Sequence, residues 1–206
     1  VNLHETCAET GRHLRHMRMV SSALGVGMLG IGFQPKWDRD DISWMPKGRY
    51  QIMRNHMPRV GTMGLDMMLR SCTVQVNLDY ADEEDMRKKF RTSLALQPVA
   101  TALFANSPFK NGKPSGLLST RAHVWTDTDN ARCGVPDCVF DPAFGYEQWI
   151  DYILSVPMYF LHRGEDYVDV AGKSFHDYLA GTLEGFEGQP PNLSDFEDHI
   201  TTAFPE

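Results

Sequence analysis

Cysteine is scarce in this sequence, and its scarcity excludes two kinds of protein. The 206 residues include four cysteines, far fewer than small secreted proteins held together by disulfides use. Cys133 and Cys138 lie five positions apart, but no second pair with zinc-finger spacing accompanies them, so a structural zinc site is not expected. This use of cysteine is typical of a reducing compartment, and we expect a cytoplasmic protein.

Long apolar runs and an excess of positive charge are also missing. The longest apolar stretch, 20–33, is broken by glycines and falls short of the roughly 20 residues that span a bilayer. The net charge is -7 and the pI is near 5.6, which argues against a general affinity for nucleic acid or for anionic membranes. Small anionic ligands in a local basic pocket are compatible with this charge.

The common nucleotide and hydrolase motifs are absent. The sequence has no P-loop, no G-x-S-x-G and no H-E-x-x-H. The glycines of GVGMLGIG, 25–32, lack both the spacing and the following helix of a dinucleotide fingerprint. The usual nucleotide-binding folds are therefore not expected.

Both ends of the chain are abrupt. There is no initiator Met, a helical pattern opens almost at Val1, and Glu206 follows directly on TTAFP. We expect a piece of a longer chain, folded as a single incomplete α+β domain over residues 1–206.

Hydrophobic periodicity divides the chain into helices and short strands. No internal repeat, low-complexity tract or interdomain linker interrupts this pattern. Helices are expected over 4–24, 48–57 and 81–106, from Phe144, over 174–183 and from about Leu193. Strands are expected over 27–33, 71–80, 117–125, 156–164 and 167–172.

The segment SCTVQVNLDY, 71–80, has an unusual polar face. Apolar and polar residues alternate along it, so Thr73, Gln75 and Asn77 share one side of the expected strand. Asn is a poor strand former, and a merely solvated face more often carries Thr, Lys or Glu. A row of short amide and hydroxyl groups on a sheet is suited to holding a ligand.

Two arginines and a tyrosine are further candidates. Arg49 in MPKGRY and Arg121 in LSTRAHVW can each clamp a carboxylate or phosphate with two hydrogen bonds. The alternative is that both make ordinary surface salt bridges. Tyr159 in VPMYF could add a phenolic donor at the rim, or could be a core residue of a strand.

Five blocks of the sequence resemble a known family. They are MPKGRYQIMRNHMP, GLDMMLRSCTVQVNLDY, KKFRTSLALQPVATALFANSPF, LLSTRAHVWTDTD and DYILSVPMYF. They are similar to the central blocks of glutamate–cysteine ligase of the plant and proteobacterial type, and the similarity extends over nearly the whole chain.

The resemblance implies a fold and a reaction. The fold would be glutamine-synthetase-like, with a curved antiparallel sheet around the active site and helices outside it. ATP would phosphorylate the γ-carboxylate of L-glutamate, and the amine of L-cysteine would attack the acyl phosphate, giving γ-glutamylcysteine in the first step of glutathione synthesis. The implied cofactors are ATP and Mg²⁺. The enzyme would be a monomer or a homodimer, cytoplasmic, or plastid if the source is a plant.

The resemblance also implies roles for single residues. Arg49 and Arg121 would bind substrate carboxylate or phosphoryl oxygens. Arg132, in DTDNARCG, matches a family arginine of less evident role. The pocket would be lined by Thr73, Gln75, Asn77, Tyr159 and Arg132.

The sequence departs from the family pattern in ways that leave alternatives open. The acidic block and the M-R-G-A-D block that flank the family's central region are absent, so the metal ligands are unknown and this piece is expected to be inactive alone. RCGVPDCVF, 132–140, also departs from the family's usual sequence, and its cysteines are given no catalytic role. A related ligase that uses another amine, or a non-catalytic module that binds amino acids, remains an alternative.

Overall fold

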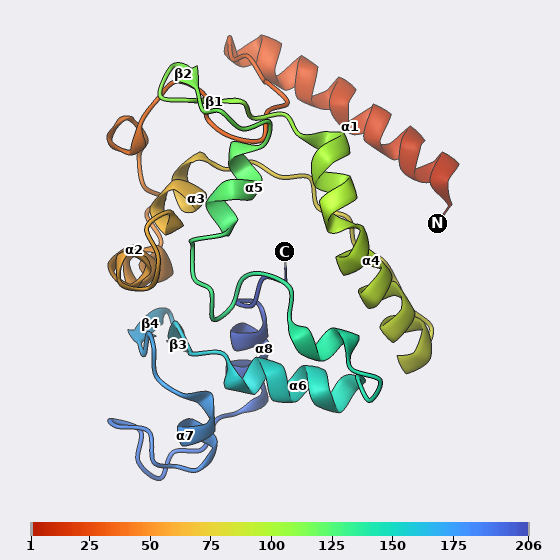
Figure 1. The fold of residues 1–206 in the computed structure, drawn as a ribbon. Helices are drawn as coiled ribbons and strands as arrows, with labels where there is room; N and C mark the ends of the chain where they lie inside the picture. Colours follow the sequence, from red (N-terminus) through yellow and green to blue (C-terminus); the bar gives the residue numbers. More distant parts are fainter. Residues whose placement is uncertain (1, 206) are drawn as a thin grey trace. The chain divides into compact units, whose positions relative to one another are not determined.

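A computed structural model describes residues 2–205, which fall into two compact units divided after Ile31 (Figure 1). The first unit consists of helix α1 (Leu3–Leu24) and the residues that follow it. Asn2 and Glu5 form a capping box at its start, and Gly25 ends it in the left-handed conformation, with φ of 66°. The predicted helix and its stop are confirmed. No helix of the described residues is long and apolar enough to cross a membrane.

The second unit opens with a loop and two helices. The short 3-10 helix η1 (Arg39–Asp41) precedes α2 (Gly48–Val60) and α3 (Gly64–Arg70). Helix α2 confirms the prediction for 48–57 and runs three residues further. Helix α3 was not predicted, because the methionine-rich run before residue 71 was interpreted as the approach to a strand.

Two further helices form an aromatic cluster. Helix α4 (Glu83–Phe104) begins at Asp82, whose side chain accepts a hydrogen bond from the Asp85 amide. It packs with the 3-10 helix η2 (Asp137–Phe140), and α6 (Tyr146–Ser155) lies against the same turn. The buried residues of this cluster are Met86, Leu94, Val139 and Phe144, and Phe90, Cys138 and Trp149 pack around them.

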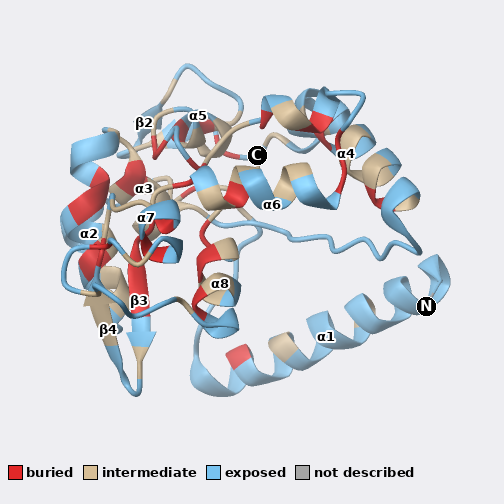
Figure 2. Cartoon of the chain, turned by 90° about the horizontal axis from the view of Figure 1, so that it is seen from below, coloured by how far each residue is buried: buried red, intermediate tan, exposed pale blue. Residues whose placement is uncertain are grey.

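Two further clusters of buried residues gather around one hairpin. Figure 2 shows them along α2, β3 and α8. Strand β3 (Phe160–Arg163) pairs with β4 (Asp166–Asp169) in antiparallel register, Phe160 opposite Asp169. The helices α7 (Phe175–Leu179) and α8 (Leu193–Ile200) complete this part, and both were predicted. Its core residues are Met158, Leu161, Val170, Phe175, Tyr178 and Leu183.

The expected curved sheet is not present among the described residues. The sheets there have two strands each, the second being β1 (Phe109–Lys110) with β2 (Lys113–Pro114) around an Asn111-Gly112 turn. Residues 73–79 form neither helix nor strand. The prediction of a strand at 71–80 was wrong for this structure, because a strand requires a partner backbone and the described residues pair with this segment only at Ser71. The fold is mostly helical.

Two other predicted strands were also wrong. Of residues 27–33, only Phe33 makes a bridge, an isolated one to Ser71. Residues 120–125 form a helix, α5 (Thr120–Trp125), whose N-cap is Ser119. The Ser119 hydroxyl accepts a hydrogen bond from the Ala122 amide at 3.1 Å, and this local bond favours helix over the alternation that suggested a strand.

Buried histidine makes the stability of this fold depend on pH. His199 stacks on Phe175, and its Nε2 donates to the Ile153 carbonyl at 2.9 Å. Burial lowers the pKa of His199 below the ordinary value of 6.5, and His56 is shifted in the same direction by its own burial. The neutral imidazoles are therefore the forms that the fold accommodates.

We predict that the free energy of unfolding decreases as the pH falls below about 6.5, because the unfolded chain then binds protons that the folded histidines do not. Urea titrations at pH values about one unit apart, from roughly 5 to 8, measure this change. His199→Gln, which cannot be protonated, should reduce the slope, whereas His176→Gln on the exposed face of α7 should not. Equal slopes in all three proteins would contradict the assignment.

Candidate functional site

Arg121 brings together two parts of the chain that sequence analysis singled out. It lies in the first turn of α5, where its backbone amide donates to the Ser107 hydroxyl at 3.1 Å. Its Nε donates to the Cys72 carbonyl at 3.0 Å, and its Nη2 donates to the Thr73 hydroxyl at 3.1 Å. Arg121 is half-buried. The bonds to Cys72 and Thr73 place its charge at the start of the polar segment.

The amides of that segment also meet. Gln75 Nε2 donates to Asn77 Oδ1 at 2.9 Å, and both side chains are exposed. On the opposite side of the alternation, Val76 and Leu78 line a hollow with residues of α4 and α6. Gln75 and Asn77 do not line this hollow.

Arg49 lies on a different element. It occupies the first turn of α2, with its guanidinium carbon 5.2 Å from the centroid of the Tyr50 ring. Its Nε is buried and has no acceptor within the described part of the chain. A buried guanidinium N–H without a partner is uncommon, and it marks a place where a ligand oxygen could bind.

Tyr159 and Arg132 belong to the interior. Each is 1% exposed, so the expectation of a phenol at a pocket rim was wrong for Tyr159. The Tyr159 hydroxyl donates to Asp129 Oδ2 at 2.9 Å, and Arg132 Nε donates to the same oxygen at 2.6 Å. Arg132 also lies over the Tyr159 ring, 3.5 Å from its centroid, and donates to Thr202 and to the Pro157 carbonyl. Burial raises the pKa of Tyr159, so the phenol remains a donor.

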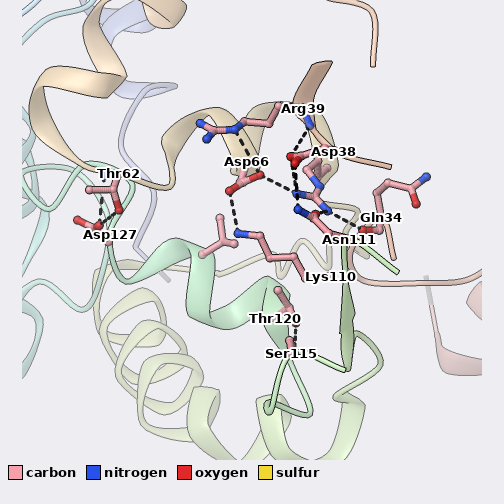
Figure 3. Close-up of polar contacts among 12 residues, drawn as sticks. Gln34, Asp38, Arg39, Thr62, Asp66, Lys110, Asn111, Ser115, Thr120 and Asp127 are labelled. Atoms are coloured by element: carbon pink, nitrogen blue, oxygen red, sulfur yellow. Dashed lines mark hydrogen bonds and ion pairs between the residues drawn. The ribbon is translucent and has the colours of Figure 1, made fainter. Parts of the chain in front are cut away.

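A second charged cluster, not found from the sequence, surrounds Arg70. Figure 3 labels its members Asp38, Asp66, Lys110 and Asn111. Arg70 is 1% exposed and donates to Asp66 at 3.1 Å and to Asn111 at 2.6 Å. Lys110 pairs with the other Asp66 oxygen at 3.1 Å, and Asp38 accepts from Asn111 at 2.9 Å. These bonds join the loop before η1, helix α3 and the β1–β2 hairpin. The only early signal was the i, i+4 spacing of Asp66 and Arg70.

The described residues do not supply a magnesium site. They contain no cluster of three or more His, Cys, Asp or Glu side chains that could hold a metal ion. The best-placed carboxylates, those of Asp66, Asp129 and Asp195, are buried and already paired with arginines. The carboxylates of residues 2–205 therefore do not fit Mg²⁺.

We predict that Tyr159→Phe lowers the free energy of unfolding by about 1–3 kcal/mol, because Asp129 loses a charge-assisted hydrogen bond in the interior. Denaturant titration measures the change, with Tyr146→Phe, at the surface, as the control. A variant of unchanged stability with weakened ligand binding would contradict the interior role and would restore Tyr159 to an accessible pocket.

Comparison with known proteins agrees with the resemblance seen in the sequence. Residues 1–206 match the model of glutamate-cysteine ligase family 2. The chain is 60% identical over 204 residues to glutamate–cysteine ligase B, chloroplastic, of Oryza sativa subsp. japonica, covering 99% of this chain and 41% of that protein. It is 60% identical to the chloroplastic enzyme of Arabidopsis thaliana, with 99% and 39% covered. It is 58% identical to the chloroplastic enzyme of Medicago truncatula, with 99% and 40% covered.

The chain thus spans about two fifths of the length of these relatives. The alignment covers nearly all of this chain, since 204 of its residues align. On this evidence the chain belongs to glutamate–cysteine ligase family 2.

Proposed function

We propose that the protein containing this chain is an ATP-dependent ligase that joins the γ-carboxylate of L-glutamate to the amine of L-cysteine, as the first step of glutathione synthesis. The observation that carries the proposal is the 60% identity to named glutamate–cysteine ligases along 99% of the chain. The arrangement around Arg121 supports it, because a guanidinium beside hydroxyl and amide groups suits carboxylate and phosphoryl oxygens.

The reaction proceeds in two steps. A γ-carboxylate oxygen of glutamate attacks the terminal phosphorus of ATP, and ADP leaves. The amine of cysteine then attacks the carbonyl carbon of the γ-glutamyl phosphate, loses a proton, and inorganic phosphate leaves. Both steps move negative charge onto phosphoryl oxygens, and a positioned guanidinium stabilises that charge.

Each candidate residue would have its own role in these two steps. Arg121 is held by Cys72 and Thr73 and would bind a carboxylate or phosphoryl oxygen. Gln75 and Asn77 would orient the glutamate through their amides, and Arg49 would bind a second anionic group with its unpaired Nε. Arg132 and Tyr159 would act indirectly, by fixing the interior from which the site is built.

The site would be completed by a sheet. We propose that residues 73–79 pair with strands from the remainder of the protein, with Val76 and Leu78 against the helices and the amides facing the substrates. This would give the curved antiparallel sheet that the family resemblance implies. The assembly would be a monomer or a homodimer.

The chemistry requires ATP as phosphoryl donor, and Mg²⁺ would accompany it on ligands other than the described residues of this chain. The relatives compared are named chloroplastic. We propose a plastid location if the source is a plant, and the cytoplasm otherwise.

We predict that Arg121→Ala in the full-length protein lowers kcat/KM for γ-glutamylcysteine formation by about 10²–10³-fold, equivalent to roughly 2.7–4 kcal/mol, because a group that stabilises transition-state charge is lost. Product and phosphate release measure it. Arg121→Lys should recover part of the loss, since the charge returns without the fork. Arg59→Ala, at an exposed position of α2, is the control.

Two results would count against the proposal. Absence of γ-glutamylcysteine from glutamate, cysteine and MgATP, with product from another amine, would indicate a related ligase. Binding of glutamate without turnover of any amine would indicate a non-catalytic module.

A further inference from the structure

Arg70 places a full positive charge in the interior, directly before the polar segment. It is the last residue of α3, and Ser71, Cys72 and Thr73 follow it. Its side chain is fully buried, so it has no surface with which to contact a substrate. A buried ion pair is often no more stabilising than apolar side chains of similar volume. Stability alone therefore does not explain a guanidinium at this position.

The Arg70 guanidinium joins three segments of the chain. Its Nη1 donates to Asp66 Oδ1 at 3.1 Å, and its Nη2 donates to Asn111 Oδ1 at 2.6 Å and to the Gln34 carbonyl at 3.3 Å. Asn111 Nδ2 in turn donates to Asp38 at 2.9 Å. Figure 3 shows the side chains of Asp38, Asp66 and Asn111 meeting here. One side chain thus connects α3 with the loop before η1 and with the turn of the β1–β2 hairpin.

The hairpin turn is fixed in an uncommon conformation at this contact. Asn111 has a φ of 52° and is the only non-glycine residue with positive φ among residues 2–205. The neighbouring Lys110 Nζ donates to Asp66 Oδ2 at 3.1 Å, and the Gly112 amide donates to the Pro35 carbonyl at 2.9 Å. Side-chain and backbone bonds therefore both hold the turn against α3 and the loop.

Backbone hydrogen bonds connect this network to Arg121. The Gln34 amide donates to the Arg70 carbonyl at 2.8 Å, and the Cys72 amide donates to the Gly32 carbonyl at 2.9 Å, so the two backbones lie side by side. Arg121 Nε donates to the carbonyl of the same Cys72 at 3.0 Å. The backbone that Arg70 anchors is therefore the one to which the Arg121 guanidinium binds.

A close approach at Gly32 brings the start of α5 against this backbone. The Gly32 amide donates to the Asn106 carbonyl at 3.2 Å. A Cβ atom at Gly32 would lie 3.3 Å from Ser107 Oγ and 3.6 Å from the Arg121 Cβ. The Ser107 hydroxyl accepts from the Arg121 amide at 3.1 Å. Both the backbone and the side chain of Arg121 thus depend on the position of this loop.

We propose that Arg70 is a positioning residue of the ligase, which fixes the backbone of residues 70–73 and thereby the place of the Arg121 guanidinium. The inference rests on the proposed function and deepens it, because it names the group that orients a substrate-binding arginine. Arg70 touches no substrate and acts only through the bonds between Arg121 and the polar segment. Loosening the network shifts the guanidinium relative to the reacting atoms, and a misplacement of about 1 Å is enough to lower a rate about 10²-fold.

The test removes contacts of the network but leaves Arg70 in place, in the full-length protein. Asn111→Gly permits the same positive φ and removes the acceptor of the Nη2 bond. Lys110→Met keeps the aliphatic chain and removes the bond to Asp66. Lys113→Met is the matched control, because it removes the same charge from the opposite strand of the hairpin. Denaturation midpoints check the folding of every variant.

Each change is made with Arg121 intact and in the Arg121→Ala variant. We expect Asn111→Gly to lower kcat/KM for γ-glutamylcysteine formation about tenfold when Arg121 is present and less than about twofold when it is absent, because a positioning group has no effect once the group it positions is gone. The loss should divide between kcat and KM as it does in Arg121→Ala. Lys110→Met should show the same pattern with a smaller loss, and Lys113→Met should leave kcat/KM unchanged.

Other results would overturn the inference. Equal losses with and without Arg121 would show that the network supports the fold in general and not this guanidinium. An unchanged kcat/KM in both Asn111→Gly and Lys110→Met would remove Arg70 from the reaction. If Asn111→Gly does not fold, the same comparison with Lys110→Met decides. A wild-type protein with no ligase activity defeats the proposed function instead, and that failure is visible before any variant is made.

Discussion

The two hydrogen bonds from Arg121 to residues 72 and 73 are the contacts on which the functional interpretation depends. They attach the polar segment to α5, and they place a guanidinium where its amides and hydroxyl begin. The other end of the segment is held by Lys89 of α4, whose Nζ donates to the Asp79 carbonyl. Because a charge-assisted bond is stronger than a neutral one, one side chain can position the segment that we propose binds the substrate.

The arginines of this chain do two different jobs, and burial separates them. Arg132 and Arg70 are 1% exposed and have carboxylate partners within the core. Removing one member of such a buried pair costs about 3–5 kcal/mol, since the other charge is left without compensation. Arg121 is only half-buried, and Arg49 retains a donor without an acceptor. The first two therefore stabilise the scaffold, and the second two are the ones we propose for a ligand.

The exposed apolar residues of 73–79 connect the fold to the proposed sheet. Val74 is 90% exposed and Val76 is 74% exposed, which is unusual for β-branched side chains that alternate with polar ones. A segment outside any helix or strand that carries such side chains is suited to pairing with another strand. We therefore propose that these exposed side chains are covered by other strands in the whole protein.

Local sequence determined several of the helices. Asn2 with Glu5, Asp82, and Asn192 with Asp195 each cap a helix through bonds within a few residues, so α1, α4 and α8 could be predicted from neighbours in the chain. The blocks of the sequence also determined the family and the residues Thr73, Gln75, Asn77, Arg49 and Arg121 as candidates. Only the tertiary structure decided that Arg121 of α5 reaches Thr73, that 73–79 has no partner strand among the described residues, and that Arg132 and Tyr159 close on Asp129 in the interior. The physical reason is range: a cap is satisfied within one turn, whereas strand pairing and burial depend on groups that lie far away in the sequence.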